Sequence, residues 1–73
     1  MITLLEIQVG SRVRLMGVND ALQKKLMQYG LHLGDSLHVL RIAPLGGPIL
    51  IEVNGREVAL GRVVAEKILV EVE

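Results

Sequence analysis

Apolar and polar residues alternate along most of this chain, and the alternation predicts a protein built mainly from short β-strands. A two-residue period places every second side chain on the same face of a strand, so apolar members face a core while their neighbours face solvent. The alternating stretches are 12–16, 36–42, 49–53, 56–60 and 68–72. Within 36–42 the apolar phase changes between Val39 and Leu40, which predicts a β-bulge or a strand that curves between two environments.

The strand faces can be assigned from the same alternation. The residues predicted to face the core are Val13, Leu15, Ile49, Ile51, Val53, Val58, Leu60, Ile68, Val70 and Val72. Within 36–42, Leu37 and Val39 share one face and Leu40 and Ile42 share the other, so both faces of this strand carry apolar residues. The first nine residues alternate imperfectly, because Leu4 and Leu5 are adjacent. We expect an irregular or single-turn segment there, with Leu4 or Leu5 and Ile7 against the core and a turn at Gly10.

One helix is predicted between the first two strands, over residues 21–29. Asn19 or Asp20 can cap its start, and Asp20 with Gln23 three residues later approximates a capping box. Gly30 is a natural helix stop in the left-handed conformation, and Leu31 beyond it is placed to pack on Leu26 as in a Schellman ending. A second, shorter helix of one or two turns is predicted within 61–67, with Val64 or Ala65 packed and Arg62, Glu66 and Lys67 exposed.

Two connections between strands have distinct chemistry. Asn54-Gly55 is the typical sequence of a two-residue type I′ hairpin turn. Residues 44–48 form a stiff loop, because proline at both ends fixes φ and removes two N–H donors, while Gly46 and Gly47 are free to adopt positive φ. This loop contains one large apolar residue, Leu45, which either folds back onto the core or makes the loop a contact site.

About five short strands, one helix after the first strand and one short helix before the last indicate a mainly β protein. Strand closure removes exposed edges, so we expect a small antiparallel SH3-like barrel that forms a single domain over residues 1–73. At 73 residues the core is near the lower size limit for independent folding. No internal repeat or linker is visible.

The composition of the chain argues against several classes of function. With eight basic and eight acidic residues the formal net charge is zero, and Tyr29 is the only aromatic residue, which argues against a nucleic-acid partner. A local basic patch from Arg12, Arg14, Lys24 and Lys25 stays open. Cysteine is absent, which excludes disulfides and thiolate chemistry. The N-terminus lacks a signal-peptide pattern and no apolar run is long enough to span a bilayer, so we expect a cytoplasmic protein without membrane insertion.

Candidate chemistry is sparse. His32, Asp35 and His38 are the only residues that suggest a metal site, and their spacing matches no recognised ligand pattern, so they are weak candidates beside two ordinary exposed histidines. No serine or threonine lies in a nucleophile-elbow pattern, and Gly46-Gly47 lacks the Lys-Ser/Thr of a P-loop. We therefore expect a non-enzymatic protein without a cofactor.

Surface residues are the remaining candidates for function. Met16, Leu45, Leu50 and Leu69 are apolar but fall on outward strand faces or in a loop. If their strands are neighbours, Met16, Leu50 and Leu69 form a contiguous patch of the kind that marks partner-binding sites. The alternative is that they cover a second small core beneath the first helix.

Three segments in order resemble blocks of the FeoA family. Residues 26–35 (LMQYGLHLGD) are similar to its L-M-x-x-G-L-x-x-G block, and residues 41–49 (RIAPLGGPI) to its R-x-A-P-L-G-x-P loop. Residues 59–70 resemble its closing segment, and the similarity extends from about Leu4 to Val72. The chain departs from the family at 61–64 (GRVV), where a more polar and basic opening of the last helix is usual.

The resemblance implies an SH3-like accessory protein of bacterial ferrous iron uptake. Its implied partner is FeoB, a membrane permease with a cytoplasmic GTP-binding domain, and its implied mechanism is protein–protein binding that assists or regulates transport. Two alternatives stay open: a regulatory domain related to the C-terminal domain of iron- and manganese-dependent repressors, and a weak divalent-metal-binding protein. A chain that begins at Met1 leaves no room for the repressors' helix-turn-helix, which favours the accessory protein; homo-oligomerisation stays open.

Overall fold

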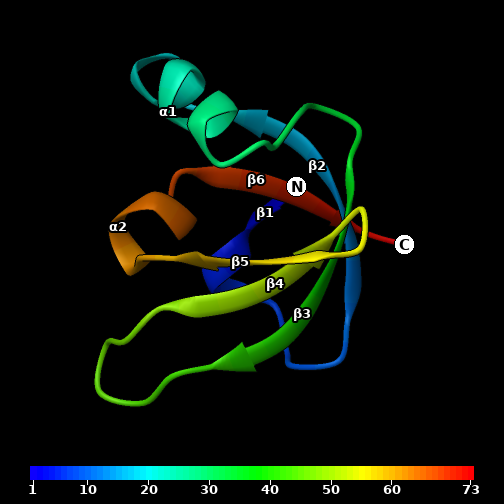
Figure 1. The fold of residues 1–73 in the computed structure, drawn as a ribbon, viewed down its shortest axis with the longest axis vertical. Helices are drawn as coiled ribbons and strands as arrows, with labels where there is room; N and C mark the ends of the chain where they lie inside the picture. Colours follow the sequence, from blue (N-terminus) through cyan, green and yellow to red (C-terminus); the bar gives the residue numbers. More distant parts are fainter.

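The computed structural model describes the backbone of residues 1–73 and every side chain except that of Asp20. The fold consists of six strands and a few short helical segments (Figure 1). The strands are β1 (Ile2–Thr3), β2 (Arg12–Val18), β3 (Ser36–Ile42), β4 (Ile49–Val53), β5 (Arg56–Leu60) and β6 (Ile68–Val72). The helices are α1 (Gln23–Gln28) and α2 (Arg62–Ala65), and single 3₁₀ turns lie at η1 (Leu4–Glu6) and η2 (Asp20–Leu22).

The strands form one antiparallel sheet in the order β1-β6-β2-β3-β4-β5. The prediction of a mainly β, SH3-like fold with one helix after the first long strand and one before the last is confirmed. The sheet has one strand more than the predicted five, because Ile2 and Thr3 pair with Val70 and Leu69 of β6. Two residues are too few to show a two-residue alternation, so β1 is recognised by its pairing with β6 and not by a sequence pattern.

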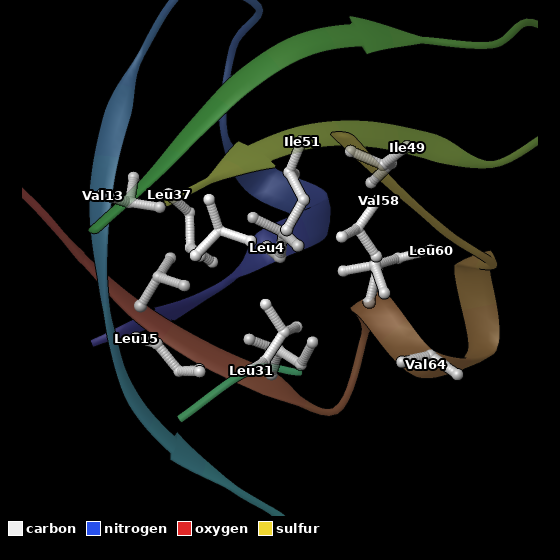
Figure 2. Close-up of a cluster of buried hydrophobic side chains, with 14 of the residues drawn as sticks. Leu4, Val13, Leu15, Leu31, Leu37, Ile49, Ile51, Val58, Leu60 and Val64 are labelled. Carbon is white, nitrogen blue, oxygen red and sulfur yellow. The ribbon is translucent and has the colours of Figure 1, made fainter. Parts of the chain in front are cut away.

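The core lies inside the curve of the sheet, where side chains from β2, β3, β4 and β5 gather around Leu4 (Figure 2). Leu4 and Ile7 are buried, as expected for the first segment. Every strand residue predicted to face inward is buried except Val72, which is exposed although its partner on β2, Val13, is buried. On β3 the buried face is that of Leu37 and Val39. All buried apolar side chains of the described residues belong to this single cluster, including those of both helices.

Two irregularities bend the sheet. The register between β3 and β4 shifts between Val39 and Arg41, so Leu40 is the extra residue of the bulge that the phase change predicts. A second shift lies between Leu15 and Gly17 on β2, opposite β6, and makes Met16 an extra residue there. Bulges increase local twist, which lets a short sheet wrap around its own core.

Helix α1 is shorter than predicted, because the chain enters through the 3₁₀ turn η2. Asn19 caps the entry: its Oδ1 accepts the N–H of Ala21 at 3.0 Å, whereas the predicted capping box of Asp20 lies outside the described side chains. The exit is the predicted Schellman ending, in which Gly30 has φ +73° and Leu31 N–H donates to Leu26 O at 3.1 Å. Among the described residues, neither this nor any other helix has the length and apolarity to cross a membrane.

Candidate functional site

The loop between β3 and β4 is a tight turn of four residues, from Pro44 to Gly47. The N–H of Gly47 donates to Pro44 O at 3.1 Å, and the two central residues, Leu45 and Gly46, have φ of +58° and +76°. Positive φ at both central positions is the signature of a type I′ turn. Of the two glycines that were free to adopt positive φ, only Gly46 does so, and the other left-handed residue of the turn is Leu45.

Gly47 is required for a different reason. A Cβ built on it would lie 2.6 Å from the Cβ of Ala43, closer than real side chains approach. The incoming and outgoing ends of the loop therefore touch at this point, and the Ala43 N–H donates to Pro48 O at 3.0 Å beside it. Glycine at 47 serves close packing of the two ends and not turn geometry.

Leu45 stands at the tip of this turn and is fully exposed, at 103% of its reference area. The interpretation that it folds back onto the core is wrong. A left-handed conformation costs a residue with a Cβ roughly 1–2 kcal/mol. The chain thus holds a leucine in an unfavourable backbone conformation and presents its side chain to solvent, and such strain is concentrated at functional sites.

The base of the loop is held by Arg62, the first residue of α2. Its Nε donates to Gly47 O at 2.8 Å and its Nη2 donates to Ala43 O at 2.9 Å. The side chain is half-buried by these contacts, so the prediction that Arg62 is exposed is wrong. One guanidinium thereby joins both ends of the loop.

The other three predicted contact residues lie elsewhere on the sheet. Met16 is exposed on the β2 bulge, and Leu69 is half-buried on the adjacent β6, where it pairs with Gly17. Leu50 is half-buried on β4, paired with Arg41 and Ala59. Strand β3 separates β4 from β2, so the structure brings Met16 and Leu69 onto neighbouring strands but leaves Leu50 apart from them.

The alternative interpretation, a second small core beneath the first helix, is wrong. The buried residues of α1 and η2, Leu26 and Leu22, belong to the main cluster, which is the only such cluster of the described residues. Met16 instead borders a shallow hollow of about 400 Å³ that is lined mostly by charged residues. Two of them, Arg14 and Glu73, form an ion pair at 3.0 Å.

An apolar groove of about 190 Å³ beside α1 was not predicted from the sequence. It is lined by Val18, Gln23, Leu26, Met27, Leu31, His32 and Leu33. Met27 and Leu33 are 70% and 60% exposed at its rim. The signal in the sequence is weak: Met27 lies next to the inward face of the helix, and Leu33 lies in a turn where polar residues are usual.

The histidines and Asp35 do not form a joint site. Asp35 Oδ2 accepts the backbone N–H of His32 at 2.8 Å and lies 3.6 Å from His32 Nδ1, so its role is to close the turn after α1. His38 lies on β3, paired with Arg12 and Glu52. Within the described part of the chain, no three His, Asp or Glu side chains gather closely enough to hold a metal ion.

The geometry defines a class: a small antiparallel SH3-like domain whose distinctive surface feature is a strained, apolar loop tip. The profile of the FeoA domain family matches residues 2–72, nearly the entire sequence. The chain belongs to the FeoA domain family, a family of non-enzymatic accessory domains of ferrous iron uptake. No significant match is found among curated protein sequences.

Solved structures agree with this assignment. An iron uptake regulatory protein, FeoA, is 29% identical with a TM-score of 0.85, over 99% of this chain and 96% of that one. The FeoA protein from Chlorobium tepidum is 38% identical with a TM-score of 0.84, over 97% of this chain and 70% of that one. The manganese regulator SloR is 28% identical with a TM-score of 0.87, and the match covers 99% of this chain but 34% of SloR.

Proposed function

We propose that this domain is a cytoplasmic binding module that docks on the cytoplasmic part of a FeoB-type ferrous iron permease and modulates transport. Membership of the FeoA family supports a role in the Feo uptake system. The observation that carries the docking proposal is Leu45, which is fully exposed in a left-handed turn. In this proposal residues 1–73 act as one domain.

The loop suits a contact role because its conformation is set before binding. Leu45 projects from a turn closed by a backbone hydrogen bond and flanked by two prolines, so little backbone entropy remains to be lost. Burying an exposed leucine side chain contributes roughly 1.5–3 kcal/mol, enough for a ten- to hundredfold change in affinity. Met16, Leu50 and Leu69 are proposed as secondary contacts, because each is less exposed than Leu45.

The test is a calorimetric titration of the domain against the purified cytoplasmic part of the permease. Leu45→Asp is the informative variant, because Asp tolerates positive φ better than Leu and so removes the apolar contact without disturbing the turn. We expect the variant to bind at least tenfold more weakly than the wild type. Leu50→Asp should have a smaller effect.

Leu33→Asp is the matched control. Leu33 is also an exposed leucine, but it borders the groove beside α1. Helix α1 lies at the opposite end of the long axis from the β3–β4 loop (Figure 1). Wild-type affinity in this variant supports docking through Leu45. A loss confined to Leu33→Asp moves the contact to the groove, and no binding by the wild type overturns the proposal.

A second candidate is a module of a larger metal-responsive regulator. The match to SloR favours it, because this chain superposes on about one third of that protein as well as on the FeoA proteins. The discriminating measurement is the mass of the native polypeptide on an immunoblot. A band near 8 kDa, the mass of this sequence, supports the accessory protein, whereas a band about three times larger supports the regulator.

A further inference from the structure

The loop that carries Leu45 has more backbone carbonyl acceptors than backbone N–H donors. Two of the five residues from Pro44 to Pro48 are prolines, so the segment has five carbonyl groups but only three N–H groups. Within the loop, the one backbone bond that closes the turn joins Gly47 N–H to Pro44 O. The carbonyls at its base need donors from another part of the chain.

Arg62 supplies these donors because the hairpin register brings it to the loop. Ile49 pairs with Leu60, so the residues that follow β5 lie beside those that precede β4. Helix α2 is fixed there by its own buried residues, Val64 and Ala65. The guanidinium of Arg62 therefore extends from a rigid position and reaches Ala43 O and Gly47 O, on the two ends of the loop.

We propose that Arg62 is a positioning residue that clamps the two ends of the β3–β4 loop and thereby holds Leu45 in its left-handed, exposed conformation for partner binding. A charged donor strengthens each bond to a carbonyl, and the planar fork serves two acceptors at once. Without these two hydrogen bonds, Leu45 relaxes to a conformation with negative φ, and its side chain no longer has the exposed position in which it would contact a partner. Arg62 is the one basic residue of the segment 61–64.

The inference rests on the proposed docking function, but the clamp has a readout that requires no partner. Amide hydrogen exchange measured by NMR reports on the Ala43 and Gly47 N–H groups, both of which donate within the loop base. In Arg62→Ala, exchange at these two amides should accelerate at least fivefold. The Leu15 amide, which donates to Asp35 O at the other end of β3, should not change.

Two variants serve as controls for this measurement. Arg62→Lys keeps the charge but lacks the fork, so it should resemble Arg62→Ala more than the wild type. Arg56→Ala removes a clamp of the same kind, since Arg56 donates to Tyr29 O at 3.1 Å and Gly30 O at 2.7 Å at the end of α1. It should accelerate exchange near Gly30 and leave the loop amides unchanged.

The link to binding is tested by a double-mutant cycle with the permease fragment. Arg62→Ala alone should weaken binding about fivefold or more, and should have less than a twofold effect in the Leu45→Asp background. A positioning residue loses its effect when the residue it positions is gone, whereas a general loss of stability would act in both backgrounds.

Each outcome decides one part of the inference. Unchanged exchange at Gly47 in Arg62→Ala, or equal acceleration at Gly47 and Leu15, overturns the local clamp. Additive losses in the cycle overturn action through Leu45. If the wild type does not bind at all, the proposed function falls and the binding link with it, while the exchange result alone decides whether the clamp exists.

Discussion

Strand β4 is entered through one tight turn and left through another, and both turns place two consecutive residues at positive φ. In the second turn these residues are Asn54 and Gly55, with φ of +50° and +80°. In the first they are Leu45 and Gly46, with φ of +58° and +76°. The backbone conformations are similar, but the residues at the first central position differ in preference: asparagine is common in the left-handed region, and leucine is rare there.

The two turns are consequently held in different ways. Asn54-Gly55 is stabilised by its own residue preferences, and space is open around Gly55. The turn at Leu45 depends on contacts from outside it: the close approach of Gly47 to Ala43, the bond from Ala43 to Pro48, and the guanidinium of Arg62. Local sequence defines one turn, and tertiary structure imposes the other.

The difference indicates what each turn is for. A turn that only reverses the chain is served best by Asn-Gly, as at residues 54–55. A leucine at the equivalent position lowers stability, and the docking role proposed for Leu45 would account for its presence there. The comparison leads to three predictions, which concern the packing of the first turn, the chemistry of the second and the cost of Leu45.

The largest effect is expected from Gly47→Ala. The new methyl group would lie 2.6 Å from the Ala43 Cβ, so the two ends of the loop must separate and the Arg62 bonds weaken. We expect a loss of about 1–3 kcal/mol in the free energy of unfolding, measured by urea denaturation. Gly17→Ala is the control, because its Cβ would meet Leu69 at an ordinary 3.7 Å. Equal stability of the two variants would contradict the close-approach argument.

A smaller loss of stability is expected from Asn54→Leu, which places a leucine at the first central position of the second turn, as in the first turn. Asn54 is exposed, so the substitution changes backbone strain and not packing. The free energy of unfolding should fall by about 1 kcal/mol, because Asn54 has a φ of +50° and leucine is more strained than asparagine in this left-handed conformation. Thermal unfolding followed by circular dichroism measures the change. A variant as stable as the wild type would show that leucine is not strained in such turns.

Much of the fold could be predicted from the sequence, because each part depends on nearby residues. Alternation identified the inward faces of β2, β4 and β5 and, apart from Val72, of β6, and Gly30 identified the Schellman ending of α1. The Asn54-Gly55 turn follows from its two residues. The phase change between Val39 and Leu40 located the bulge in β3. In each case the signal and the structure lie within a few residues of each other.

The candidate site could be predicted only in part, because its geometry depends on distant residues. The sequence marked Leu45 as unusual, but two prolines and two glycines allow more than one placement of the positive φ angles. Arg62 selects one of them through carbonyls 15 and 19 residues away. In the same way, the separation of Leu50 from Met16 depends on β3 lying between their strands, a matter of topology that spacing does not encode.

The central claim, that Leu45 is kept at a cost to stability for the sake of binding, is tested most directly by Leu45→Asn. Asparagine suits the left-handed conformation, so the free energy of unfolding in urea should rise by about 0.5–1 kcal/mol, while affinity for the permease fragment should fall at least tenfold. A variant that is less stable than the wild type, or that binds as tightly, would contradict the account.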